Sequence, residues 1–148
     1  MILDAKQFKP YVDAFNAEDA EDVVNLIPNT AAFEWMASNC PRFECPDKEL
    51  EKIYYFRWWT YRKHIKQTPA GMVLTEFILP VRHAGAHNTV SCAIGHHLAE
   101  GRWLRDQGFL DEYIRFWLRG ENGGPQPHLH KYSLWTADAV LDRARVTG

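Results

Sequence analysis

The segment that most constrains the fold is residues 54–65 (YYFRWWTYRKHI), where aromatic side chains recur at helical spacing on two faces. One stripe runs through Tyr54, Trp58 and Tyr61, and an adjacent stripe runs through Tyr55 and Trp59. A helix with a single apolar face lies on one core, whereas two aromatic-rich faces require cover on both sides, or a core on one side and a ligand on the other. The pattern predicts an inner helix of a helical barrel.

The rest of the chain reads as further helices separated by short turns. Asn16 and Pro28-Asn29 are predicted helix starts, Pro46 precedes the aromatic helix, Gly120 is a predicted helix end, and Ser133 a predicted cap. The predicted helices cover residues 17–26, 30–38, 46–65, 88–105, 109–119 and a last segment after 133, and residues 72–79 are predicted to be extended. The sequence therefore predicts a mainly α protein, with Leu134, Ala137, Leu141 and Ala144 facing inward in the last helix.

Charge and composition exclude several classes of protein. The net charge of −2, with acids and bases mixed, gives no basic surface for a nucleic acid. No apolar run approaches the roughly 20 residues that span a bilayer, and no signal peptide is visible, so we expect a cytoplasmic protein by default. Three cysteines, an odd number, indicate reduced thiols rather than a disulfide framework.

The loop of residues 78–91 (ILPVRHAGAHNTVS) is the most site-like stretch. It gathers Arg82, His83, His87, Asn88 and Thr89 at the predicted entrance of a helix, where side-chain and backbone donors can bind a hydroxyl or a carboxylate. Alternatively, Asn88 only caps the helix and the histidines are solvated. Downstream, the small side chains at positions 93, 95, 99 and 101 would allow another helix to approach closely.

Catalytic groups are harder to identify. Glu76 is a weak candidate, because burial in its apolar segment would raise its pKa, whereas Glu100, Asp106 and Asp138 are candidates by composition only. Six of the seven histidines fall between residues 83 and 130, but no HExxH or CxxC motif accompanies them, so no metal or other cofactor is predicted. Whether the chain is itself an enzyme stays open.

Several sequence segments between residues 54 and 140 resemble the first hairpins of bacterial alpha/alpha-barrel (six-hairpin) glycosidases, the group around mannosylglycerate hydrolase and trehalase-like enzymes. These segments are YYFRWWTYRKHI (54–65), LTEFILP (74–80), HAGAHNTVSCAIGHHLAEGRWLRD (83–106), YIRFW (113–117) and SLWTADAV (133–140). The resemblance implies helical hairpins that form part of an (α/α)6-barrel-like toroid. It divides a single helical domain, residues 1–148, into an N-terminal helical lead-in (1–44) and partial glycosidase-like hairpins (45–148).

The resemblance also implies a sugar pocket at one end of the barrel. By position it points to His83, His87, Asn88 and Thr89 as substrate contacts, with Tyr55 and Trp59 behind them. The general acid and base of such enzymes lie in later hairpins, so the resemblance carries no catalytic residue onto this chain.

The expected function is the carbohydrate-binding portion of a glycoside hydrolase, or a short protein related to one, acting on oligosaccharides or glycosyl acids. The alternatives are a non-catalytic helical interaction or oligomerisation module and a small metal-dependent enzyme that uses the histidine cluster. Because the aromatic helix has two faces to cover, we expect a homo-oligomer or contact with the remainder of a longer barrel.

Overall fold

The computed structural model describes residues 3–85, 87–120, 124–131 and 134–148. Within them the fold is mainly helical with one two-stranded sheet, which confirms the predicted fold class. The helices and strands are α1 (Lys9–Glu18), α2 (Asn29–Asn39), α3 (Lys48–His64), β1 (Ile65–Thr68), β2 (Gly71–Leu74), α4 (Ile94–Gly101), α5 (Gly108–Arg119) and α6 (Thr136–Thr147). Short 3-10 turns cover Ala5–Phe8, Arg82–Ala84, Ser91–Ala93 and Pro127–His130. In the described ranges no helix is both long and apolar enough to cross a membrane.

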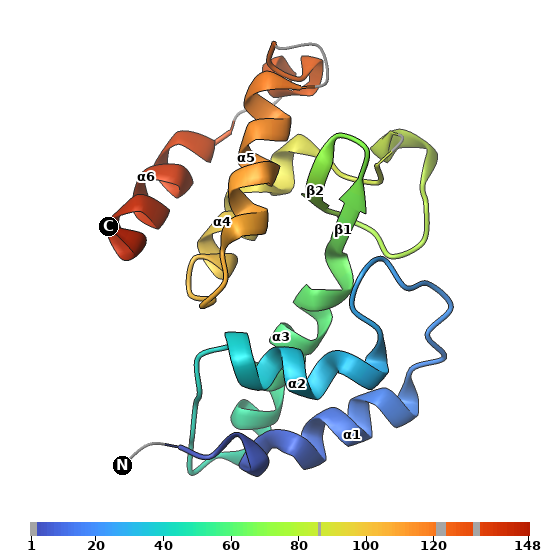
Figure 1. The fold of residues 1–148 in the computed structure, drawn as a ribbon, viewed down its shortest axis with the longest axis vertical. Coiled ribbons are helices and arrows are strands. Elements are labelled where there is room, and N and C mark those ends of the chain that lie inside the picture. The colour runs from blue at the N-terminus through green and yellow to red at the C-terminus, as the bar shows by residue number, and fades with distance from the viewer. Residues whose placement is uncertain (1–2, 86, 121–123, 132–133) are drawn as a thin grey trace.

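Helix α3 connects the two ends of the molecule (Figure 1). Helices α1 and α2 lie beside it at one end, and its last turn leads into the hairpin beside α4 and α5 at the other. Asp47 caps its first turn by accepting hydrogen bonds from the N–H groups of residues 49 and 50, while Arg62, Lys63 and His64 lie at the C-terminal end, where the helix dipole favours cations.

The two predicted aromatic faces of α3 are both covered. On one side Tyr55 stacks on Phe8 with ring centroids 4.4 Å apart, and Trp59 packs against Phe15 of α1. On the other side the Tyr61 hydroxyl donates to the backbone carbonyl of His97, 2.9 Å away, and thereby joins α3 to α4. The predicted two-sided packing is confirmed.

The hairpin β1–β2 was only half predicted. The sequence predicts residues 72–79 to be extended, but β2 covers Gly71–Leu74. Its antiparallel partner β1 was not predicted, and its first residue, Ile65, was placed at the end of the helix. The Thr68 hydroxyl donates to the carbonyl of Gly71 at 2.7 Å, and Gly71 adopts φ 105°, a conformation that glycine reaches without strain. The helix therefore ends at His64, one residue before the predicted end, and the turn lets the chain pair with itself as a hairpin.

Two helix predictions are wrong for identifiable reasons. Residues 19–28 are not helical, because the helix before them begins earlier, at Lys9 with Pro10 in its first turn, and ends at Glu18. Asn16 is not a cap: its side chain donates to the carbonyl of Asn29 at 2.9 Å and accepts from Trp59 Nε1 at 2.8 Å. The helix expected over 88–105 shrinks to Ile94–Gly101, preceded by an irregular loop.

Helix α6 packs on α4, and α5 packs on β2. The face predicted to point inward in α6 is wrong, since Ala137, Leu141 and Ala144 are exposed and Ala139 is the buried residue. The predicted cap, Ser133, lies outside the described residues. Small residues in α4 do admit close neighbours, as expected: a Cβ at position 95 would lie 2.6 Å from the Trp135 ring.

Candidate functional site

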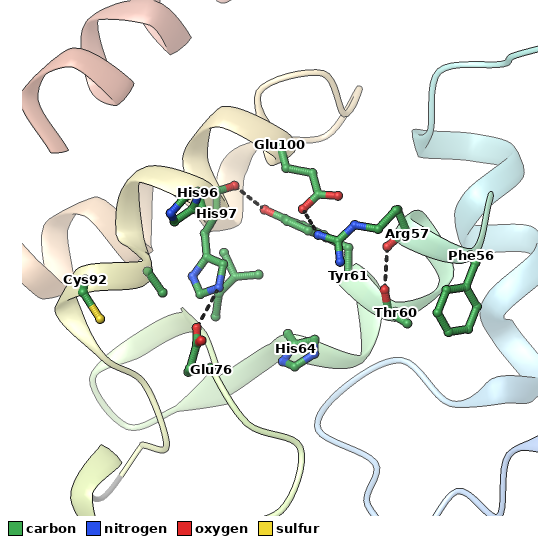
Figure 2. Close-up of a pocket in the computed structure, with 12 residues that line it drawn as sticks. Phe56, Arg57, Thr60, Tyr61, His64, Glu76, Cys92, His96, His97 and Glu100 are labelled. Atoms are coloured by element: carbon green, nitrogen blue, oxygen red, sulfur yellow. Dashed lines mark hydrogen bonds and ion pairs between the residues drawn. The ribbon is translucent and has the colours of Figure 1, made fainter. Parts of the chain in front are cut away.

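A cleft of about 660 Å³ opens between α3, the end of β2 and the segment leading into α4 (Figure 2). We call it the cleft. Its lining residues are Phe56, Arg57, Thr60, Tyr61, His64, Leu74, Glu76, Cys92, Ala93, His96, His97 and Glu100. Its volume lies in the range usual for sites that bind small molecules.

One wall of the cleft is a third face of α3, between the two covered ones. Phe56 is 43% exposed; its ring stacks on Trp59 with centroids 5.8 Å apart and leaves part of its apolar surface open. Arg57 reaches across to α4, with its Nη2 2.8 Å from Glu100 Oε2. Thr60 lies one turn further along the same wall, its hydroxyl bonded to the Arg57 carbonyl. The wall combines a stacking surface with charged and neutral hydrogen-bonding groups.

Glu76 lies at the opposite side of the cleft, two residues after β2. Its backbone N–H donates to the carbonyl of Asn88 at 2.9 Å, which fixes the chain at this point. Partial burial raises the pKa of the Glu76 carboxyl, and the nearby His96 opposes that rise only in part. The expected effect of burial on this carboxyl is confirmed.

His97 faces Glu76 from α4 (Figure 2), with its Nε2 3.6 Å from Glu76 Oε2. Burial lowers the pKa of His97 to about 3, and the positive neighbours His64, His96 and Arg57 add to the effect. His97 is therefore a neutral imidazole at physiological pH. It adds no positive charge beside Glu76 and can exchange only hydrogen bonds with it.

A second, smaller cavity of about 350 Å³ lies beside the loop before α4, and we call it the hollow. Its lining residues are Ala84, Gly85, His87, Thr89, Phe116, Trp117, Gln126, Pro127, His128 and Lys131. The His87 ring packs edge-on against Phe116, with centroids 5.5 Å apart. Buried Trp117 Nε1 makes no full hydrogen bond with the described residues, but it lies near enough to the Tyr113 hydroxyl to oppose the rise in its pKa. The hollow thus combines aromatic walls with polar groups.

Comparisons with known proteins bear on the class to which this site belongs. Residues 86–148 match the family model described as a mannosylglycerate hydrolase MGH1-like glycoside hydrolase domain. A solved structure titled "Sialidase" superposes with a TM-score of 0.90 at 48% sequence identity over 95% of this chain.

The chain is glycosidase-like.

The family match confirms the predicted resemblance to mannosylglycerate hydrolase, and it covers α4 and the second half of the loop, with His87, Asn88 and Thr89. The glycosidase-like chain spans 13% of the length of the sialidase chain that it matches. A comparison with curated proteins found no match.

The structure distributes the predicted substrate-binding residues over three places. His87 and Thr89 come together at the hollow. Arg82 and His83 lie on an exposed 3-10 turn nearby. Tyr55 and Trp59 are 3% and 5% exposed against α1, away from both the cleft and the hollow.

Asn88 has a structural task in the glycosidase-like chain. It is 4% exposed and adopts φ 57°, and its side chain accepts from Val81 N at 3.1 Å and donates to the carbonyls of Phe77 and Leu79. An asparagine tolerates this left-handed backbone better than most residues do. Asn88 therefore folds the loop rather than capping the helix.

Sequence reasoning missed most of the cleft. Arg57 and Thr60 lie on a face of α3 that carries no strong aromatic stripe, and His96 was considered only as a metal ligand. The available signal was the helical spacing of Phe56, Thr60 and His64, four residues apart each time. Over the described ranges, no three His, Cys, Asp or Glu side chains gather closely enough to hold a metal ion.

Proposed function

We propose that this glycosidase-like chain is the carbohydrate-binding portion of a glycoside hydrolase and that it binds an oligosaccharide or a glycosyl acid in the cleft. The observation that carries the proposal is the placing of the partly exposed Phe56 ring beside Arg57 and Thr60, with Glu100 paired to Arg57 and Glu76 across an opening of about 660 Å³. Aromatic rings stack on the apolar faces of sugars, while polar groups around them take the hydroxyls.

The arrangement suits a sugar better than an apolar ligand. The Arg57–Glu100 pair presents N–H donors and carboxylate acceptors on adjoining walls, 2.8 Å apart. Arg57 keeps 62% of its side chain exposed, so a ligand can reach it. For a glycosyl acid, the guanidinium of Arg57 can bind the carboxylate through two parallel N–H donors.

Glu76 is the residue to which we assign a chemical role. A carboxyl with a raised pKa holds its proton closer to neutral pH, which is what a general acid needs when it protonates a leaving group. Glycoside hydrolysis requires a second carboxylate at a fixed separation. Since the chain spans 13% of the length of the sialidase that it matches, we assign that second group to the longer protein.

The loop after β2 is proposed to add substrate contacts through the hollow. His87 and Thr89 line it directly, and Arg82 and His83 lie exposed at its approach. Asn88 holds this loop in shape through its three backbone contacts. Tyr55 and Trp59 act from behind, by fixing the helix that carries Phe56 and Arg57.

The proposal is tested by titration calorimetry against neutral oligosaccharides and glycosyl acids. Phe56→Ala and Arg57→Met should each weaken binding at least tenfold, because they remove the stacking surface and the charged donor. Ile53→Ala is the matched control, since Ile53 is 56% exposed one turn earlier on α3 and does not line the cleft. No heat with any sugar, or equal weakening by the control, would refute binding in the cleft.

An association role is a second proposal, supported by a different observation. Leu50, Ile53, Trp103 and Leu141 are each at least half exposed, which is unusual for large apolar side chains. We propose that these surfaces are covered in a homo-oligomer or by the remainder of a longer barrel. Light scattering after size exclusion tests the first case: a monomer at tens of micromolar that stays monomeric on further concentration would contradict self-association.

A further inference from the structure

A line of polar side chains crosses the core between the cleft and the hollow. It begins at Glu76, whose Oε2 lies 3.6 Å from His97 Nε2. His97 Nδ1 lies 3.0 Å from the Tyr113 hydroxyl, and that hydroxyl lies 3.2 Å from Thr89 Oγ1. Glu76 lines the cleft and Thr89 lines the hollow, so the line joins the two cavities.

Burial makes these contacts obligatory for the inner members. Tyr113 is fully buried, Thr89 is 5% exposed and the His97 side chain is 15% exposed. A polar atom so placed loses its bonds to water and must find partners within the protein. The Glu76 side chain is 36% exposed and can rotate, so a movement of a few tenths of an ångström brings it within hydrogen-bonding distance of His97.

The hydrogen bonds along this line can all be made in either of two donor–acceptor directions. With Glu76 ionised, Thr89 donates to Tyr113, Tyr113 donates to His97 Nδ1, and His97 Nε2–H donates to the carboxylate. With Glu76 protonated, its O–H donates to Nε2, Nδ1–H donates to the tyrosine oxygen, and Tyr113 donates to Thr89. Each residue donates once along the line in either direction, so both states leave no member unpaired.

Burial lowers the pKa of His97 and keeps it neutral, and the charges around the line act in the same direction. His96 precedes it on α4, Arg57 and His64 lie on α3, Glu100 points toward Arg57, and the Cys92 thiol lies in the turn before α4. Helix α5 contributes Tyr113 itself. Because His64, His96 and Arg57 all disfavour a cationic His97, protonation of Glu76 changes the tautomer of His97 and not its charge.

We infer that His97, Tyr113 and Thr89 are positioning residues that form a hydrogen-bonded relay from Glu76 in the cleft to the hollow. Protonation of Glu76 reverses the relay and turns the Thr89 hydroxyl from a donor to Tyr113 into a donor free to face the hollow. By reciprocity, a group that accepts a hydrogen bond from Thr89 favours the protonated form of Glu76. The use of this proton in catalysis rests on the proposed function, whereas the relay itself does not.

The first experiment follows the ring nitrogens of His97 by ¹⁵N NMR from pH 4 to 8, without sugar. Wild type should change from the Nδ1–H to the Nε2–H tautomer as Glu76 loses its proton. Glu76→Gln should abolish that pH dependence, and the matched control Glu100→Gln should retain it, because Glu100 lies in the cleft outside the relay. A His97 tautomer that is constant in wild type across the titration of Glu76 would overturn the inference.

The second experiment measures the pKa of Glu76 from the ¹³C shift of its carboxyl in Tyr113→Phe and Thr89→Val. Each variant leaves a buried donor of the protonated state without an acceptor, so each should lower the pKa of Glu76. Tyr54→Phe and Thr60→Val are matched controls, since their hydroxyls donate to backbone carbonyls away from the relay. An unchanged pKa in both folded relay variants would refute the connection to the hollow.

The proposed sugar binding and the proposed relay are tested by independent measurements, so either can be refuted without the other. Absence of sugar binding leaves the NMR result standing, and an unresponsive His97 leaves calorimetry unaffected. If neither relay variant folds, the wild-type titration and Glu76→Gln decide alone.

Discussion

The hydroxyl of Tyr61 stands directly over Gly101, so close that a Cβ added there would lie 2.2 Å from its oxygen. The same hydroxyl donates to the carbonyl of His97. Helix α4, which carries His96, His97 and Glu100, is thereby held against α3 at a point where only glycine fits. The spacing of the two cleft walls depends on this contact.

Gly101→Ala should therefore destabilise the protein by about 1–3 kcal/mol, the usual cost of overpacking a buried site. Urea unfolding followed by tryptophan fluorescence measures the change. Gly108→Ala is the matched control, because its added Cβ would meet nothing closer than 3.5 Å. Equal stability of the two variants would show that α4 shifts without cost.

Arg62 should be among the most sensitive positions in α3. It is 1% exposed, donates to the carbonyl of Ile27 at 2.6 Å and to the side chain of Asn29, and lies over the Trp59 ring. Arg62→Met leaves those acceptors buried without a donor, at a cost of about 1.5–3 kcal/mol.

The contrast for this prediction is Arg57→Met, which breaks an exposed ion pair and should cost less than about 1 kcal/mol. Thermal or urea unfolding of both variants checks the order. A larger loss at Arg57 than at Arg62 would contradict the assignment of Arg62 as the residue that ties α3 to the segment before α2.

Glu76 should make stability depend on pH in a defined direction. Because burial raises its pKa above the ordinary value of 4.5, the folded state binds its proton more tightly than the unfolded state. The contribution of Glu76 to the free energy of unfolding therefore falls as pH rises from below 4.5 through the raised pKa, and then levels off.

Glu76→Gln removes this dependence. Its free energy of unfolding relative to wild type should increase with pH over that interval, as measured by urea titrations at several pH values. A difference that shrinks with rising pH would mean that the folded state favours the carboxylate.

Much of the fold follows from local sequence signals, and the failures have physical causes. Helix α5 and its end at Gly120 follow from amphipathic spacing and a residue that adopts φ 54°. The two-sided packing of α3 follows from its aromatic content. Asn16 and Asn88 were predicted as helix caps because asparagine is common at that position. Asn16 instead bonds to Asn29, 13 residues away, and Asn88 bonds to backbone groups of its own loop.

The site was less predictable than the fold. The effect of burial on Glu76 could be read from the apolar residues around it. The pairing of Arg57 with Glu100, 43 residues apart, and of His97 with Tyr113 depends on how α3, α4 and α5 pack. No local pattern encodes such distances, which is why the cleft came into view only with the tertiary structure.

Two of the three cysteines, Cys92 and Cys40, should differ sharply in reactivity. Cys92 is exposed in the cleft, whereas Cys40 is buried and burial raises the pKa of its thiol. Because the thiolate is the nucleophile, iodoacetamide should modify Cys92 well before Cys40. Mass spectrometry of peptides over a time course checks the order, and early modification of Cys40 would show that the helix pair around it opens readily.

The carboxylate of Glu112 in α5 accepts a hydrogen bond from the backbone N–H of Met72 at 2.7 Å. That N–H lies on the edge of β2 that is not paired with β1. An unpaired N–H at a sheet edge can hydrogen-bond to a strand of another chain. The contact therefore satisfies a donor at the open edge of the sheet and ties α5 to the hairpin. Glu112 lies outside the cleft, so removing its carboxylate would leave this edge donor unpaired without changing the cleft lining.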